Sequence, residues 1–283
     1  MRDGSWRRVG RGAYLVRHTS PTAPTSRREV ALAAIVGVHH RLSSPHWFSH
    51  GSAALLWGLP LWRTPASTHV LQRHTTGSRH DPAVRRHVGE PPPDERDRVV
   101  GLPVTSLERT ALDCATTLSP LEALVVCDAA LRAGADPDRI RDLATRRTGR
   151  RGIVRARAVL ELADPGAESP GETAARFVVL CDGLPAPQTQ VAVSTRLGVY
   201  WADMGWESWR VLLEYDGQDK YDDRSALIAE KRRSDAIAEA GWRLLRVTRD
   251  DLRGHGVSQR VLRLAAPHHP SAPGPRRPLR WTR

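Results

Sequence analysis

The sequence is short of cysteine, of lysine and of long apolar runs, and each shortage limits what the chain can be. Its three cysteines, Cys114, Cys127 and Cys181, have the spacing of neither a disulfide framework nor a cysteine-rich metal site. No stretch approaches the roughly 20 apolar residues of a membrane-spanning helix, and the first residues lack the apolar segment of a signal peptide. These absences predict a cytoplasmic protein with no membrane partner.

The chain is strongly basic, with a formal net charge of +12 and a pI near 10.9 over 283 residues. Such an excess is typical of proteins that bind nucleic acid, because arginine neutralises phosphates and releases their counterions. Only two of the 43 basic residues are lysines, Lys220 and Lys231, so part of the excess reflects a general preference for arginine. The net charge therefore favours DNA as a partner, and the sequence motifs are needed to indicate which function the protein has.

Three carboxylates follow closely on two apolar stretches in the C-terminal half. Val211–Tyr215 has the pattern of a short buried strand that contains Glu214 and ends at the turn Asp216-Gly217. Side chains two residues apart on a strand share a face, so Glu214 and Asp216 should point the same way. Asp203 ends the preceding apolar stretch, and the connection after it is short enough for a hairpin. The three carboxylates should therefore converge.

Clustered buried carboxylates repel one another and lose hydration, so a cation is expected to balance them. Magnesium takes oxygen ligands and is commonly held by one or two carboxylates together with a substrate phosphate. Manganese shares this preference for carboxylate oxygens. The pattern therefore predicts a Mg²⁺ or Mn²⁺ site suited to phosphodiester hydrolysis.

The order Asp203, apolar strand, Glu214-Tyr-Asp216 resembles the PD-(D/E)XK nuclease superfamily. It is most similar to the very-short-patch-repair (Vsr)-like endonuclease domains grouped as domain of unknown function 559, from about residue 169 to 252. The resemblance implies a catalytic site of Asp203, Glu214, Asp216 and Glu172, with the metal on Asp203, Glu214 and Glu172. Glu172 also has a structural explanation, because Ser169-Pro-Gly-Glu172 is a capping box.

One position departs from the superfamily pattern. Asp216 stands where the superfamily has a lysine, so the charge that stabilises the transition state must come from elsewhere. The sequence offers three candidates for it: Lys220, Lys231 and Arg246.

The N-terminal part resembles the AbiEi family of antitoxin-like proteins. Ser52-Ala-Ala followed by Gly58-Leu matches one pattern of that family, and Val104-Thr followed by Arg109-Thr and Asp113 matches another. Residues 6–16 resemble the hairpin that ends the family's winged helix, whose helices are then either upstream of the assigned start or lost. A plain N-terminal hairpin is the alternative. The resemblance implies an antitoxin or transcriptional regulator, with DNA as a partner and a protein partner for this domain.

Other polar residues of this part have simpler explanations. Arg109 and Asp113 lie four apart on a predicted helix and most simply pair with each other. His46 and His50 are also four apart, but no third ligand of known spacing accompanies them, so no metal is predicted there. Four further histidines are scattered over a strand and a charged loop, where a structural or solvated role is expected: His69, His74, His80 and His87.

The turn-rich segment after Asp164 divides the chain into a mostly helical region, 1–164, and a mixed sheet flanked by helices, 165–252. The fold class is therefore α+β. Residues 253–283 are rich in proline and arginine and are expected to be disordered. A basic run before the boundary is either a solvated linker or a contact to the DNA backbone. Its candidates for that contact are Arg146, Arg147, Arg150 and Arg151.

Two functional hypotheses follow. In the first, the protein binds DNA and its C-terminal domain is a Mg²⁺-dependent endonuclease, as the three acids favour. In the second, it is a non-catalytic AbiEi-like antitoxin or regulator that uses the nuclease fold as a DNA-binding platform, as the missing lysine favours. A third interpretation makes the acids a surface salt-bridge network with Arg243, Arg246 and Lys220.

Overall fold

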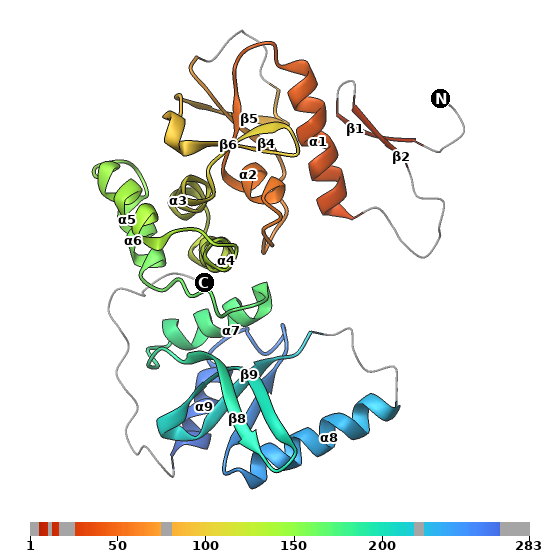
Figure 1. Cartoon of the computed structure of the whole chain (residues 1–283), viewed down its shortest axis with the longest axis vertical. Helices are drawn as coiled ribbons and strands as arrows, with labels where there is room; N and C mark the ends of the chain where they lie inside the picture. The colour runs from red at the N-terminus through yellow and green to blue at the C-terminus, as the bar shows by residue number, and fades with distance from the viewer. Residues whose placement is uncertain (1–5, 11–12, 17–25, 75–80, 218–223, 267–283) are drawn as a thin grey trace. The chain divides into compact units, whose positions relative to one another are not determined.

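The computed structural model describes residues 6–10, 13–16, 26–74, 81–217 and 224–266 (Figure 1). The chain divides into two compact units, residues 1–162 and 163–283, each with its own core. The division lies two residues before the boundary expected from the sequence. No helix among these residues is long and apolar enough to cross a bilayer.

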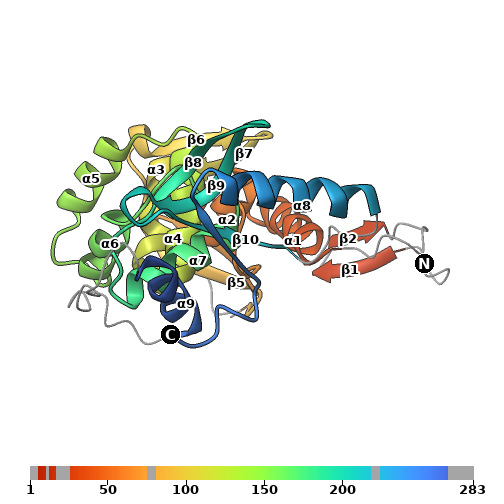
Figure 2. The ribbon, with the colours of Figure 1, turned by 90° about the horizontal axis from the view of Figure 1, so that it is seen from below.

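Unit 1 begins with a hairpin of β1 (Trp6–Gly10) and β2 (Ala13–Val16), the two strands expected at 6–16. The hairpin lies beside α1 (Arg27–Arg41), as both views show (Figures 1 and 2). Ser26 caps α1, because its hydroxyl accepts from the Glu29 N–H while the Glu29 carboxylate accepts from the Ser26 N–H.

A five-stranded sheet forms the centre of unit 1, in the order β5-β4-β3-β7-β6. Its strands are β3 (Trp47–Phe48), β4 (Thr68–Gln72), β5 (Val84–Val88), β6 (Arg96–Val99) and β7 (Leu102–Thr105). A one-turn helix, η1 (Pro93–Glu95), precedes β6. Helices α1 and α2 (His50–Leu56) pack on the sheet through Ile35, Val38, Ala53 and Leu55.

This sheet adds strands that the sequence did not predict to a region that is mostly helical, as expected. Residues 79–98 were expected to be a charged loop, yet they contain β5 and part of β6. Both are edge strands, which commonly carry charged residues because one side faces water. Their sequences, Val-Arg-Arg-His-Val and Arg-Asp-Arg-Val, therefore lack the apolar pattern by which strands are recognised.

Four helices complete unit 1: α3 (Leu107–Thr117), α4 (Pro120–Arg132), α5 (Pro137–Arg146) and α6 (Ile153–Leu160). They pack through fully buried apolar side chains, among them Leu112, Leu124, Ile140 and Val159. Serine or aspartate residues precede three of them, and Pro120 and Pro137 start α4 and α5, as capping rules predict.

Unit 2 is a four-stranded sheet in the order β11-β10-β9-β8. Helix α7 (Pro170–Cys181) leads into an antiparallel meander of β8 (Gln188–Thr195), β9 (Gly198–Trp206) and β10 (Val211–Tyr215), with η2 (Glu207–Trp209) between the last two. Helix α8 (Arg224–Glu239) then crosses over to β11 (Arg243–Val247), which pairs with β10 in parallel. The α+β class is confirmed.

The two faces of this sheet are covered by different helices. Helices α7 and α9 (Gly256–Ala265) share one core with the sheet, and α8 covers the other face through Ile237. Helix α9 corrects the expectation that the chain is disordered from residue 253. Val257, Val261 and Ala265 recur every four residues and are buried, so this stretch has an apolar helical face. Residues 267–283 lie outside the described part.

Candidate active site

Asp203 and Glu214 lie on the adjacent strands β9 and β10. The β9–β10 register pairs Met204 with Leu213, so each carboxylate comes from a residue next to that pair. Asp203 has no partner in the β8–β9 register, where Gln190 opposite it has a φ of +51°. At this irregularity the Asp203 carboxylate meets β10, where its Oδ2 accepts a hydrogen bond of 2.7 Å from the Tyr215 N–H. The carboxylate is thereby fixed at the end of β10.

The Asp203 carboxyl is electrostatically disfavoured as an anion. Burial raises its pKa from 3.8 to about 7, and Glu172 and Glu214 add to the rise. The Tyr215 N–H and the Arg233 guanidinium act in the opposite direction without cancelling it. Near neutral pH the group is thus partly protonated, and a bound cation would favour its charged form.

Glu214 is buried and is paired with two arginines. Arg233 of α8 donates to both of its oxygens, with Nη2–Oε1 at 2.6 Å and Nη1–Oε2 at 3.2 Å. The Arg246 Nε of β11 lies 3.4 Å from Oε2. Arg233 also donates to the Trp201 carbonyl at 3.0 Å, so its guanidinium is held between β9 and β10. A bidentate pair of this kind fixes both partners.

Sequence reasoning did not include Arg233 among the charge-stabilising candidates, which were Lys220, Lys231 and Arg246. Lys231 is exposed on α8, and Lys220 lies outside the described residues. Arg246 does lie beside Glu214, and it also donates to the Ser234 hydroxyl and to Glu230. The signal for Arg233 was helical spacing, because it precedes the buried Ile237 by one turn and so lies on the face of α8 that meets the sheet.

The structure places Glu172 near Asp203 but gives it a local role as well. Ser169 Oγ accepts from the Glu172 N–H at 3.1 Å, the expected N-cap. The Glu172 carboxylate accepts from the Glu168 N–H at 2.7 Å, one residue earlier than a capping box requires. Gly171 packs so closely on the Tyr215 ring that an added Cβ would overlap it. This contact holds Glu172, the next residue, close to the strand end where Tyr215 binds Asp203.

Asp216 directly follows β10. Its N–H donates to the Val247 carbonyl at 2.8 Å, which continues the β10–β11 pairing by one residue. Asp216 thus lies at the same strand end as Glu214.

The donor set fits a hard divalent cation such as Mg²⁺ or Mn²⁺ better than a softer metal such as zinc. Asp203 and Glu214 offer carboxylate oxygens only, and Mg²⁺ needs no more than one or two of these besides water and phosphate. Among the described residues, three acids with ligand atoms all within 4.8 Å of one another are not found. A metal in unit 2 would therefore depend on Asp203 and Glu214, with the Asp203 pKa as the observation in its favour.

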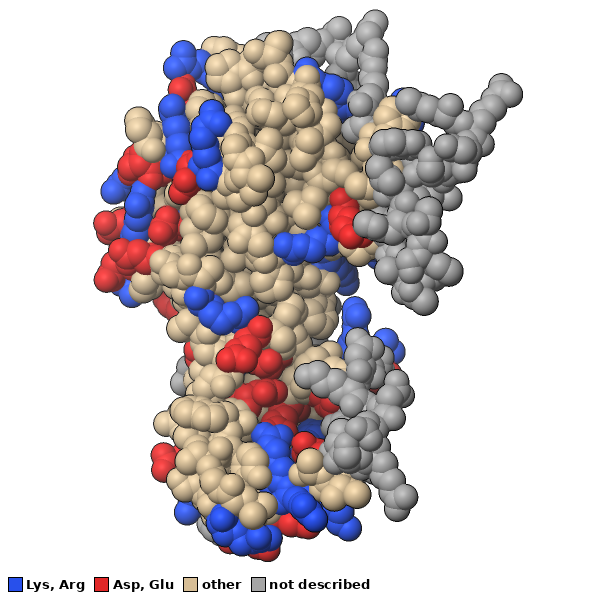
Figure 3. Space-filling view, turned by 45° about the vertical axis from the view of Figure 1, so that its right-hand side comes forward, with Lys and Arg blue, Asp and Glu red and all other residues tan. Residues whose placement is uncertain are grey.

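The basic run of unit 1 separates into two kinds of arginine. The Arg147 guanidinium contacts Glu95 at 2.5 Å and the Leu143 carbonyl at 3.1 Å, so it is used within the unit. Arg146 is 62% exposed, and Arg150 and Arg151 are exposed in the turn after α5. On the face drawn in Figure 3, basic and acidic side chains are interspersed.

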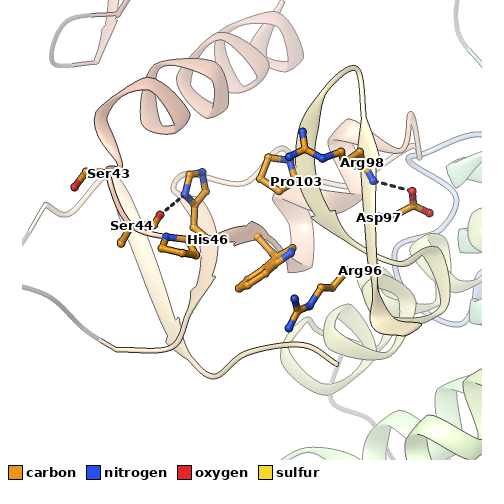
Figure 4. Close-up of a pocket in the computed structure, with 9 residues that line it drawn as sticks. Ser43, Ser44, His46, Arg96, Asp97, Arg98 and Pro103 are labelled. Atoms are coloured by element: carbon orange, nitrogen blue, oxygen red, sulfur yellow. Dashed lines mark hydrogen bonds between the residues drawn. The ribbon is translucent and has the colours of Figure 1, made fainter. Parts of the chain in front are cut away.

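Unit 1 also contains an open hollow of about 690 Å³ beside Trp47 (Figure 4). The Arg96 guanidinium lies 4.5 Å above the Trp47 ring, and Arg98 and His46 line other parts of the wall. None of the lining residues is a site residue predicted from the sequence. Elsewhere in unit 1, Arg109 pairs with Asp113 at 2.7 Å, as expected, and also with Glu95.

Comparison with known proteins decides part of the family relationship. Residues 48–162 match the model of the AbiEi antitoxin C-terminal domain. Uncharacterized proteins from two strains of Mycobacterium tuberculosis are 33% identical over 205 residues, which are 72% of this chain and 74% of each relative. The chain belongs to the family of these mycobacterial proteins. No solved structure matches it significantly.

The AbiEi resemblance is thereby confirmed for residues 48–162 of unit 1, whereas the winged-helix resemblance of residues 6–16 stays a prediction. The Vsr-like resemblance of unit 2 stays a prediction, supported by the strand positions of its acids.

Proposed function

We propose that this protein is a DNA-binding regulator of the AbiEi antitoxin type whose unit 2 is a metal-dependent nuclease. The match over residues 48–162 supports the first part, together with a net charge of +12. The observation that carries the second part is Asp203, a half-buried carboxylate beside Glu214 on neighbouring strands, with a pKa of about 7.

Asp203 and Glu214 are the residues that would hold Mg²⁺ or Mn²⁺, with Glu172 close to Asp203. When bound, the ion would activate water and stabilise charge on a phosphodiester. The Tyr215 N–H orients Asp203 for this task. Arg233 and Arg246 place two guanidinium groups beside the acids, where they suit a phosphate oxygen and supply the positive charge missing at position 216.

The test is cleavage of plasmid and linear DNA by the purified protein with Mg²⁺ or Mn²⁺. Asp203→Asn and Glu214→Gln should each lower the rate at least about 100-fold, because each removes a charged oxygen ligand. Glu207→Gln, which changes an exposed carboxylate of η2, is the matched control and should cleave like the wild type. Cleavage that persists in both site variants, or without a divalent metal, contradicts the nuclease proposal.

A specific observation favours a second candidate, a non-catalytic DNA platform. Both oxygens of Glu214 are engaged by Arg233, which already balances its charge without a metal. This candidate predicts that no preparation cleaves DNA, while wild type, Asp203→Asn and Glu214→Gln all bind it in a salt-dependent manner. Anisotropy measurements in EDTA report binding apart from cleavage, so the two candidates are separable.

The DNA-binding part has its own test in the exposed arginines after α5. Arg150→Gln and Arg151→Gln together should weaken affinity for all DNA sequences and reduce the slope of log K against log salt by about 0.9 per lost phosphate contact. Arg263→Gln, an exposed arginine of α9 outside this run, is the control. An unchanged slope in the double variant means that the run does not contact DNA.

A further inference from the structure

Three histidines that are distant in the sequence come together in unit 1. His50 is the first residue of α2, His69 lies in β4 and His87 lies in β5. One ring nitrogen of each lies within 4.8 Å of those of the other two. Within the described part of the chain, this is the one group of three such ligands at that spacing.

The sheet explains the convergence. In the parallel β4–β5 pair His69 lies opposite Arg85, and His87 is two residues further, so both histidines face the same side. His50 lies two residues after β3, the other neighbour of β4, and the Ser49 N–H between them donates to the His69 carbonyl at 3.2 Å. His50 has a φ of +52°, a left-handed conformation that is unfavourable for a non-glycine residue. The fold thus holds this ring in place against a local preference.

The ring nitrogens already have nearly the spacing of metal ligands. His69 Nδ1 lies 3.1 Å from His87 Nε2, and two nitrogens bound to one tetrahedral ion at about 2.0–2.1 Å are separated by about 3.3 Å. His50 bonds to the Ser49 hydroxyl through Nδ1 at 2.9 Å, which leaves its Nε2 for another partner.

The three rings are neutral imidazoles at neutral pH. Burial is the main reason that the pKa of His50 lies well below its usual value and that of His69 at about 3, and the neighbouring rings and Arg85 act in the same direction. Burial also lowers the pKa of His87, although Asp113 opposes the effect. Neutral imidazole is the form that binds transition metals. The contact between His69 and His87 contains one proton, which a metal ion would replace.

Asp113 provides an independent observation. It is buried, its Oδ1 accepts from Arg109 at 2.7 Å, and its Oδ2 has no hydrogen-bond partner. Buried carboxylate oxygens normally have partners. Metal-binding histidines usually donate their second ring N–H to a carboxylate, and the effect of Asp113 on His87 shows that the two groups are near each other.

We propose that His50, His69 and His87 form a binding site for a divalent transition metal of the zinc class, with Asp113 orienting His87. Three nitrogen ligands leave a fourth position open for water or another ligand. The rings of His50 and His87 are stacked, with centroids 3.9 Å apart and planes 14° apart, so binding requires His50 to tilt out of the stack. The site does not depend on the proposed nuclease, whose acids lie in unit 2.

The test is binding of Zn²⁺ and Co²⁺ to the full chain after chelator treatment. Asp203→Asn is used as the parent, because it weakens the carboxylate site of unit 2. The expected result is one Zn²⁺ per chain and the strong visible absorption of four-coordinate Co²⁺. In His69→Gln and His87→Gln, the affinity for Zn²⁺ should fall at least about 100-fold. Removing a residue that only orients a metal ligand lowers metal affinity by up to about 100-fold, and removing the ligand itself should cost at least as much. His46→Gln is the matched control, since His46 also contacts a histidine, His39 at 3.0 Å, and should bind Zn²⁺ like the parent.

Two further measurements separate metal binding from misfolding. Asp113→Asn should weaken Zn²⁺ binding about 10- to 100-fold. In the parent, Zn²⁺ should raise the unfolding temperature and EDTA should reverse this, because a ligand of the folded state stabilises it. The proposal is overturned if the parent binds no Zn²⁺, if His69→Gln and His87→Gln bind it as the parent does, or if His46→Gln loses it equally.

Discussion

Replacing Asp203 with asparagine should stabilise the protein above neutral pH. Burial and the neighbouring acids Glu172 and Glu214 raise the Asp203 pKa from 3.8 to about 7 in the folded state. Because the folded state binds this proton more tightly than the unfolded chain does, stability is greatest while Asp203 is protonated. It declines as the pH rises from about 4 through about 7. Asparagine keeps the oxygen that accepts from the Tyr215 N–H and removes the charge.

The size of the effect follows from the two pKa values. They differ by about 3, and each pH unit corresponds to about 1.36 kcal/mol, so the upper limit is about 4 kcal/mol. Asp203 is only half-buried, and solvent screening reduces the cost of its charge. We therefore expect Asp203→Asn to be more stable than the wild type by about 2 kcal/mol at about pH 8 and equally stable near pH 4.

Thermal unfolding in EDTA at about pH 4.5 and about pH 8 measures this difference, which corresponds to a Tm increase on the order of 10 °C for a unit of this size. Glu207→Gln removes an exposed carboxylate and should leave the pH dependence unchanged. Mg²⁺ should stabilise the wild type above neutral pH but not Asp203→Asn. An asparagine variant no more stable than the wild type at about pH 8 would refute the argument that burial disfavours this charge.

Two further predictions concern the packing around this site. Arg233→Gln should destabilise the protein by about 2 kcal/mol, measured by denaturant unfolding. This is less than the roughly 3–5 kcal/mol lost when a fully buried ion pair is broken, because Glu214 keeps a second arginine, Arg246. The double variant Arg233→Gln/Glu214→Gln should recover part of the loss. Additive losses would mean that the pair is not coupled. Gly171→Ala should cost about 1–3 kcal/mol, because the added methyl overlaps the Tyr215 ring. Gly217→Ala, with open space around it, should change Tm little, and equal effects of the two substitutions would contradict the packing argument.

Much of unit 2 was predictable from short-range patterns. The strand Val211–Tyr215 has the predicted bounds, because a short apolar run followed by the turn residues Asp-Gly is typical of a buried strand. Helix α8 (Arg224–Glu239) ends before Gly241, a residue that commonly terminates helices. The convergence of Asp203 and Glu214 followed from the short connection between their strands.

The partners of these acids were not predictable in the same way. Arg233 is one of three consecutive basic residues, Lys231 to Arg233, and only the docking of α8 on the sheet selects which of them reaches Glu214. The same holds for His69 and His87, for which the sequence predicted only structural or solvated roles. The two rings come together only because β4 pairs with β5. Strand β5 is an edge strand, and its charged sequence lacks the apolar pattern by which a strand is recognised.

The sequence by itself determined the α+β class, the division near residue 164, the acids of unit 2 and the AbiEi resemblance in unit 1. It could do so because periodicity, turn residues and motifs are local properties of the chain. The tertiary structure alone decided which charges meet. Glu214 is balanced by Arg233, burial raises the pKa of Asp203 to about 7, and the rings of three histidines meet in unit 1. These are consequences of strand order, register and helix docking, which bring together residues that no spacing in the sequence relates.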